Sequence, residues 1–234
     1  MARAKTERIQ NRLLAALSRA DYKKLLPDLQ RVELTLTDEL YQAGETVRHA
    51  WFPDSGIVSL LSTAHNHSSV EIGVVGNEGI AGVNVFLGVA VTRHRALVQA
   101  QGSAMRMSAA ALRRHVEHSA ALRRLLMRYT HALMMQIAQS AVCLRTHTVE
   151  ERAARWLLLT LDFGQSDVFS MTQEFMVPML GVRRERVTQA AGKLQKQGLI
   201  RYSRGEITVL DRPGLKAAAC ECYPIIRAEY DFLR

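Results

Sequence analysis

Side chains that can read DNA bases follow one another at helical spacing in the last third of the sequence. Arg184 matches the O6/N7 edge of guanine, Glu185 can accept from the amino group of cytosine, and Gln189 can pair with adenine through two hydrogen bonds. Lys193 and Arg204 are better suited to phosphates, which position a protein and make its affinity salt-dependent. The candidate DNA-contacting residues are Arg183, Arg184, Glu185, Thr188, Gln189, Lys193 and Arg204.

Positive charge is concentrated around these residues. The chain has 234 residues, with 31 basic and 22 acidic side chains and a net charge of +9. The segment from Arg183 to Arg204 contains seven basic residues and one acidic residue, so it carries six of the nine net charges. This favours a polyanionic partner, whereas the alternative is a polar helix face that is merely solvated.

The surrounding pattern predicts a helix-turn-helix. Thr172 is suited to cap a short helix that reaches Leu180, and Gly181 permits the positive φ of a tight turn. A second helix is expected from about Arg183 to Gly198. Its apolar face would pack on the first helix, which Pro178 should kink. The residues expected to pack together are Val187, Ala191 and Leu194 with Phe175, Met179 and Leu180.

A hairpin follows the second helix, and a different pattern precedes the motif. Leu199–Tyr202 and Glu206–Leu210 are expected to pair, with Arg204 at the tip of the turn. Residues 21 to about 112 contain short β-branched runs between turn residues, which favour a sandwich or a barrel-like roll. The strands expected there are Val32–Tyr41, Ile57–Thr63, Val70–Val75, Ala96–Ala100 and Ala104–Ser108.

Helices are expected between these two regions. One covers Ala109–His118, a long one covers about Ser119–Arg145, and a third begins after Thr148 and ends at Gly164. The long helix has an apolar stripe that either packs on its own β domain or forms a seam with a second copy, and the seam is the favoured interpretation. The predicted dimerisation residues are Leu122, Leu126, Tyr129, Leu133, Ile137 and Leu144.

The sequence resembles the Crp/Fnr family of transcription regulators. The similarity lies in the runs 171–189, 194–200 and 207–215, which look like the winged helix-turn-helix of that family, and in shorter matches to its β-roll. The β-roll matches are Gly44-Glu45, Phe52-Pro53, Gly56–Leu61 and Val75–Gly79. By motif position, Arg184, Glu185 and Gln189 correspond to the base-contacting residues, although the family commonly has arginine where Gln189 stands.

The resemblance implies an α+β fold in three parts. Residues 1–118 would form an N-terminal, jelly-roll-like β-roll that resembles a cyclic-nucleotide-binding sensor domain, 119–147 the dimerisation helix, and 148–234 the winged helix-turn-helix DNA-binding domain. It further implies a cytoplasmic homodimer that binds double-stranded DNA at a near-palindromic site, with its recognition helices about 34–36 Å apart. RNA polymerase is a further partner that the family suggests.

The expected effector pocket departs from that of the cyclic-nucleotide-binding members, which use a Gly-Glu pair and an Arg-Ser pair. Gly82-Val83 and His94-Arg95 stand at these positions, so the carboxylate and the serine are both missing, while Arg93 or Arg95 could still hold an anion. The predicted pocket is Gly82, Val83, Arg93, His94 and Arg95. No cofactor is predicted, a cyclic nucleotide is not favoured, and the effector is unknown.

Other chemistry is only weakly indicated. Three cysteines cannot build a disulfide framework, which favours a reducing cytoplasm. Cys220-Glu221-Cys222 could be a redox pair or metal ligands, but burial as small apolar side chains is favoured; His65 and His67 are assigned to a solvated loop. We therefore predict no metal site. No nucleophile–base pair and no apolar run long enough to span a membrane are present, so neither an enzyme nor a membrane protein is expected.

The sequence thus predicts a sequence-specific DNA-binding transcription regulator. A signal at the β-roll would change packing along the long helix and so set the positions of the two recognition helices. Two alternatives remain open. One is a ligand-sensing module that acts through protein partners, and the other is a constitutive DNA binder with a vestigial effector pocket.

Overall fold

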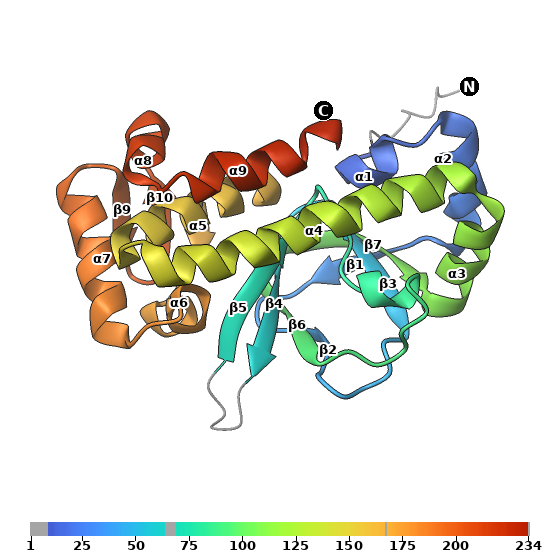
Figure 1. The fold of residues 1–234 in the computed structure, drawn as a ribbon, viewed down its shortest axis with the longest axis horizontal. Coiled ribbons are helices and arrows are strands. Elements are labelled where there is room, and N and C mark those ends of the chain that lie inside the picture. The colour runs from blue at the N-terminus through green and yellow to red at the C-terminus, as the bar shows by residue number, and fades with distance from the viewer. Residues whose placement is uncertain (1–8, 64–68, 167, 234) are drawn as a thin grey trace, which may run out of the picture.

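The computed structural model describes residues 9–63, 69–166 and 168–233. A β-sheet region and a helix-rich region lie at opposite ends of the molecule, and one long helix, α4 (Ala120–Thr146), runs along both of them (Figure 1). Buried residues from both regions belong to one continuous hydrophobic core. The two regions are therefore packed against each other.

The N-terminal region consists of two antiparallel sheets preceded by short helices. One sheet has the strand order β1-β7-β3 and the other has the order β2-β6-β4-β5. The strands are β1 (Gln30–Leu34), β2 (Glu39–Tyr41), β3 (His49–Pro53), β4 (Ile57–Thr63), β5 (Ser69–Val75), β6 (His94–Ala100) and β7 (Gly102–Ser108). The short helices of this region are α1 (Arg12–Ala15), α2 (Arg19–Leu25), η1 (Leu26–Asp28) and η2 (Val83–Val85).

One predicted strand is wrong in this region. The alternating run 32–41 forms two strands, because β1 pairs with β7 in one sheet whereas β2 pairs with β6 in the other. The chain crosses between the sheets at Thr37, which has a φ of 72° and donates its backbone N–H to the carbonyl of Val98 at 2.9 Å. The alternation of apolar and polar residues fits each of the two strands, but it does not reveal that the chain crosses from one sheet to the other between them.

Side-chain caps fix the helices that follow. Ser108 caps α3 (Ala109–His118), Ser119 caps α4, and Thr148 with Glu151 forms a capping box at α5 (Val149–Gly164). The inner face of α4 lies on β5 and on α9 (Cys222–Glu229), which runs beside it (Figure 1). Gln136 joins all three elements, since its Oε1 accepts from Val74 N at 2.7 Å and its Nε2 donates to Tyr230 Oη, just after α9, at 3.0 Å.

The C-terminal region contains two central helices and a three-stranded sheet of order β8-β10-β9. Its remaining elements are β8 (Val168–Ser170), α6 (Gln173–Leu180), α7 (Arg184–Lys196), β9 (Ile200–Ser203), β10 (Glu206–Val209), α8 (Arg212–Ala218) and η3 (Asp231–Leu233). The prediction of an α+β fold with an N-terminal β-roll, a long helix and a C-terminal winged helix-turn-helix is confirmed. None of the helices described here is long and apolar enough to cross a membrane.

Candidate nucleic-acid interface

Two short helices, α6 and α7, pack across a glycine turn as predicted. Thr172 accepts a hydrogen bond from Phe175 N at 3.2 Å and so caps α6, while Gly181 ends it with a φ of 60°. Val187 and Leu194 on α7 are buried, which holds one face of that helix against the domain. The α7 helix can therefore present its other face to a partner without losing its packing.

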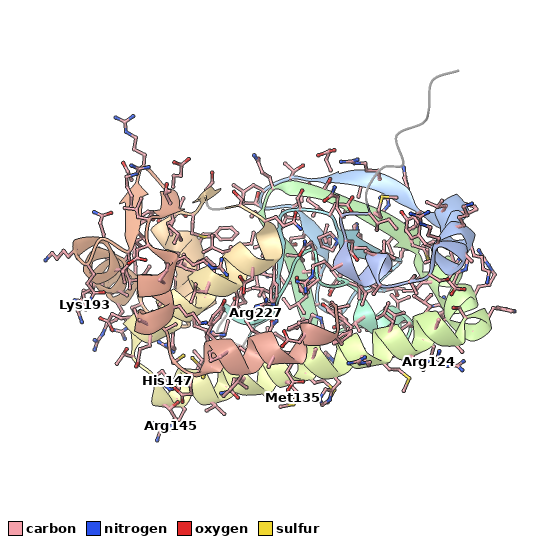
Figure 2. The ribbon with its side chains drawn as sticks, turned by 90° about the horizontal axis from the view of Figure 1, so that it is seen from above. Arg124, Met135, Arg145, His147, Lys193 and Arg227 are labelled. Carbon is pink, nitrogen blue, oxygen red and sulfur yellow. The ribbon has the colours of Figure 1, made fainter. Side chains whose placement is uncertain are left out.

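The predicted DNA-contacting residues all lie on exposed positions. Lys193 projects from α7 at the end of the molecule that is opposite the β-roll (Figure 2). The exposed set comprises Arg183, Arg184, Glu185, Thr188 and Gln189 at the start of α7, Lys193 further along, and Arg204 in the wing turn. The start of α7 is thus open to the approach of a duplex, as base reading in a groove requires.

Two of these cations are held by carboxylates of neighbouring helices. Arg184 Nη1 lies 3.1 Å from Glu174 Oε1, and Lys193 Nζ lies 2.5 Å from Glu150 Oε1. The side chains of Arg184 and Lys193 are 61% and 64% exposed, so each ion pair contributes little to stability. A base edge or a phosphate can therefore replace either carboxylate.

The wing is a hairpin with a third strand. Arg204 and Gly205 both have positive φ, 53° and 77°, which is the combination that a two-residue type I′ turn requires. The wing is joined to the recognition helix, because Tyr202 N donates to Gln195 Oε1 at 2.7 Å. The sequence did not indicate β8, which pairs with β10. Arg204 is fixed at the tip by this sheet.

Pro178 lies within α6, which remains one helical segment from Gln173 to Leu180. Like any proline inside a helix it removes one backbone donor, and α6 ends soon afterwards at the Gly181 C-cap.

The predicted effector residues are in part brought together, but most already have protein partners. His94 lies between Tyr41 Oη, 3.3 Å from its Nε2, and Thr92 Oγ1, 2.8 Å from its Nδ1, and burial lowers the pKa of its imidazole. The Tyr41 hydroxyl also contacts the backbone of Gly82, whose φ is 98°. Tyr41 thus occupies the space between Gly82 and His94.

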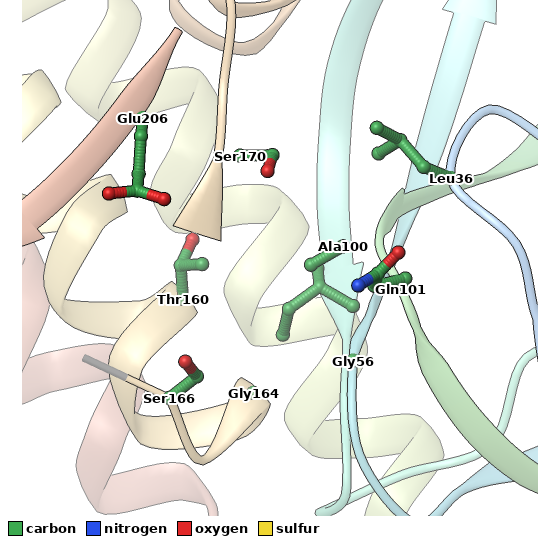
Figure 3. A pocket seen from close by; sticks show the side chains of 10 residues that line it. Leu36, Gly56, Ala100, Gln101, Thr160, Gly164, Ser166, Ser170 and Glu206 are labelled. Carbon is green, nitrogen blue, oxygen red and sulfur yellow. The ribbon is translucent and has the colours of Figure 1, made fainter. Parts of the chain in front are cut away.

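The remaining effector candidates do not converge with these two. Arg95 pairs with the carboxylate of Glu39, Arg93 is exposed, and Val83 is half-buried at the start of η2. A pocket of about 310 Å³ lies elsewhere, between the β-roll and the C-terminal region (Figure 3). Gln101 lines it from one side, and Thr160, Ser170 and Glu206 line it from the other. A polar ligand in this pocket would contact both regions at once.

A buried polar chain also links the two regions. Trp156 Nε1 on α5 donates to Glu71 Oε1 on β5 at 2.9 Å, and Ser59 Oγ lies 2.7 Å from Glu71 Oε2 and 2.5 Å from Gln99 Oε1. Burial raises the pKa of Glu71 to about 8, against the opposing effects of Ser59, Arg155 and Trp156. A protonated Glu71 can donate a hydrogen bond to Ser59 Oγ. The Ser59 hydroxyl can then donate to Gln99 Oε1. The neutral acid therefore supplies a proton for both of these oxygen–oxygen contacts, while the buried Gln99 Nε2 has no partner among the described residues.

The predicted dimerisation residues are mostly inside the protomer. Leu122, Leu126, Tyr129 and Leu133 are buried in its own core, and Ile137 packs partly against that core. Leu144 is 40% exposed. The predicted seam stripe is thus the side of α4 that faces the β-roll and α9 within the protomer. The buried members are not available to a second copy in this arrangement.

One group of residues that the sequence reasoning separated is brought together. Ligand atoms of Cys143, His147, Cys220 and Cys222 all lie within 4.8 Å of one another. The close spacing of Cys220 and Cys222 was a signal, but nothing in the sequence indicated that the end of the long helix would meet them. His65 and His67 lie outside the described residues.

These features define a class of protein that combines a β-roll, a long connecting helix and a winged helix-turn-helix. Comparison with known families agrees, since residues 151–218 match the family described as the Crp-like helix-turn-helix domain. This match agrees with the resemblance inferred from sequence: residues 151–218 carry a Crp-like helix-turn-helix domain, and the chain has the fold of solved regulators of the Crp/Fnr family. The chain matches none of the curated proteins significantly.

Solved structures of this family have the same fold. FixK2 from Bradyrhizobium japonicum superposes with a TM-score of 0.69 at 16% identity, covering 82% of this chain and 98% of FixK2. The regulator CLP of Xanthomonas campestris, described as responsive to c-di-GMP, gives 0.66 at 14% identity over 83% and 100% of the two chains. A CRP family regulator from Thermus thermophilus gives 0.67 at 18% identity over 80% and 96%.

Proposed function

We propose that the protein is a homodimeric, cytoplasmic regulator that binds a near-palindromic DNA site through α7 and the wing. The observation that carries this proposal is the exposed start of α7, where Arg184, Glu185 and Gln189 project from a helix whose opposite face is buried. This arrangement suits direct reading of bases in a major groove. Lys193 and Arg204 are assigned to contacts with the DNA backbone. RNA polymerase is the partner through which the bound regulator is expected to change transcription.

The homodimer seam is assigned to the outer face of α4. Met127, His131, Met134, Ala138 and Ala141 are exposed and follow one another at alternating spacings of four and three residues, which is the repeat of a coiled-coil seam. Met127 and Met134, at 60% and 63%, are the two most exposed large apolar side chains in the described part of the chain. Pairing two copies of the chain along this face would cover both methionines and place two α7 helices on one duplex.

The regulatory signal is assigned to the contact between the β-roll and the C-terminal region. The pocket of Figure 3 and the Glu71 chain both lie at this contact, so a ligand or proton there would bias the position of α7. The alternative is a constitutive DNA binder, which is favoured by the existing partners of His94 and Arg95. A panel of nucleotides and metabolites in a thermal-shift assay separates the two, because a ligand of the folded state raises the melting temperature.

Selection of bound duplexes from a random pool tests the DNA-binding proposal. The expected result is an enriched near-palindrome, bound with an affinity that falls steeply with salt. Binding without sequence preference, or without salt dependence, would contradict it and favour a module that docks proteins. For the seam, Met134→Glu should shift the protein toward monomer in sedimentation experiments. The matched control is Leu87→Glu, which alters an exposed leucine of the β-roll and should leave the dimer intact.

A further inference from the structure

The Cys/His cluster, formed by Cys143, His147, Cys220 and Cys222, lies where the long helix meets the C-terminal region. Cys143 is in the last turns of α4, and His147 is the C-cap residue of that helix (Figure 2). Cys220 and Cys222 flank Glu221, the N-cap residue of α9. Three cysteines are buried, and the imidazole of His147 is only 12% exposed. The four side chains therefore converge in a closed space between two helices.

The distances within the cluster fit the ligands of one metal ion. Cys143 Sγ and Cys220 Sγ are 3.5 Å apart, and Cys222 Sγ is 3.6 Å from His147 Nδ1. Ligands of a tetrahedral zinc ion lie roughly 3.4–3.8 Å from one another, given bonds of about 2.3 Å to sulfur and 2.0 Å to nitrogen. An iron–sulfur cluster binds its ligands through different iron atoms, which would separate some of them by more than the 4.8 Å found here.

The histidine is oriented as a metal ligand should be. Its Nε2 lies 3.1 Å from Glu221 Oε1, so the N–H can be donated to the carboxylate while Nδ1 keeps its lone pair toward Cys222. Thr146 Oγ1 is also 3.1 Å from Nδ1, but its hydroxyl lies 2.8 Å from the carbonyl of Val142. One hydroxyl proton can serve only one of these acceptors, so donation to Val142 leaves Nδ1 free.

The surroundings of the cluster suit negatively charged sulfur. Arg152 and Arg155 are buried, and the Nε atoms of both lack a hydrogen-bond partner in the described part of the chain. Arg152 interacts electrostatically with Cys143 and Cys220, and Arg155 interacts with Cys143. Gln139 Nε2 donates to Cys222 Sγ at 3.1 Å. Three thiolates around a divalent ion carry a net charge of about −1, which nearby guanidinium groups would balance.

We propose that Cys143, His147, Cys220 and Cys222 bind one zinc ion in a closed, four-coordinate structural site. Binding releases the three thiol protons, and no redox step is involved. The ion fastens the start of α9 to the end of α4 and so fixes the C-terminal region on the long helix. This inference does not depend on DNA binding, and its tests use no DNA.

Metal content is the first test. The full chain is purified under reducing conditions without chelators, and zinc is measured by mass spectrometry; about one ion per chain is expected. Replacement by Co²⁺ should give a thiolate-to-metal charge-transfer band and the intense visible bands of a four-coordinate ion. Cys220→Ser and His147→Ala should lose this spectrum. His115→Ala is the matched control, because His115 is another largely buried histidine whose Nε2 contacts a carboxylate, that of Asp28 at 2.7 Å, but it lies on α3.

A second variant keeps the test decisive if loss of a ligand unfolds the protein. Glu221→Gln leaves all four ligands in place but weakens the acceptor for His147, so zinc affinity should fall about 10–100-fold in competition with a chromophoric chelator. Glu229→Gln should leave the affinity unchanged. A folded, reduced wild-type chain that takes up neither zinc nor Co²⁺ would overturn the proposal. So would a disulfide between Cys143 and Cys220, detected as a loss of two hydrogen masses, that re-forms in preference to metal binding after reduction.

Discussion

The DNA-facing side of α7 and the Cys/His cluster are built in opposite ways. On α7, Arg184, Glu185 and Gln189 lie within two helical turns and project into solvent. In the cluster, Cys143 and Cys220 are 77 residues apart in sequence, yet their sulfur atoms are in contact and buried. Exposed side chains that share no partner can be removed one at a time. A buried ligand set acts as a unit, so the loss of one member should disable the rest.

Metal removal should have the largest effect and should act on stability. Stripping zinc from the reduced chain with a strong chelator is expected to lower the free energy of unfolding by about 3 kcal/mol or more, since even free metal at 100 times Kd stabilises by about 2.7 kcal/mol. Denaturant unfolding with and without metal measures this. In the control variant Lys193→Ala, removal of zinc should lower the free energy of unfolding by the same amount as in wild type. Identical unfolding curves for the zinc-loaded and zinc-free chains would show that the cluster is not a structural metal site.

Local patterns explain how much the sequence could predict. The limits of α3 and of β4, the Thr172 cap and the Gly181 turn follow from residues close in sequence, and all were expected. The same is true of the exposed face of α7. Each of these features depends on helix or strand periodicity and on the backbone preference of a single residue.

Features that depend on long-range packing were missed. The apolar stripe of α4 was read as a seam because periodicity reports a buried face without saying what covers it, and Tyr129 is in fact buried by the protomer itself. The crossing at Thr37 and the meeting of Cys143 with Cys220 have the same origin. In each case the partner lies in a segment that the local pattern does not specify.

The Glu71 chain belongs to neither α7 nor the Cys/His cluster but links the β-roll to α5, and it should respond to pH. The pKa of Glu71 is raised to about 8 by burial, so between roughly pH 4.5 and 8 the unfolded chain loses a proton that the folded chain keeps. Stability should therefore fall as pH rises through this window, by a few kcal/mol. Glu71→Gln mimics the neutral acid toward Trp156 and Ser59, so this part of the slope should vanish.

Unfolding free energies measured from pH 5 to 8 check this prediction. Burial also raises the pKa of Glu78 to about 7. Because Glu78 is present in both the wild type and Glu71→Gln, the difference between their two curves isolates Glu71. Glu33→Gln, a change at an exposed carboxylate of β1, is the control and should leave the slope as in wild type. Parallel curves for wild type and Glu71→Gln would mean that Glu71 is ionised in the folded protein.

Arg184→Ala should affect recognition without affecting stability. A bidentate contact to a base contributes about 1–3 kcal/mol of discrimination, so affinity should fall roughly 10–100-fold on the selected duplex. The loss should disappear when the base pair that Arg184 reads is changed. Competition titrations against single-base variants measure this. An equal loss on every duplex would instead assign Arg184 to the backbone, and a changed melting temperature would implicate its pair with Glu174.

The smallest effect is expected at Lys193, and it should appear in the salt dependence of binding. Removing one phosphate contact reduces the slope of log affinity against log salt by about one unit and weakens all duplexes alike. Glu150→Gln should act in the opposite direction, because it frees Lys193 from the carboxylate that holds it at 2.5 Å. Lys24→Ala is the matched control, since Lys24 is also exposed and paired, with Asp21 at 3.1 Å, but lies on α2. A slope that Lys193→Ala leaves unchanged would place this side chain outside the DNA contact and confine the interface to the start of α7 and the wing.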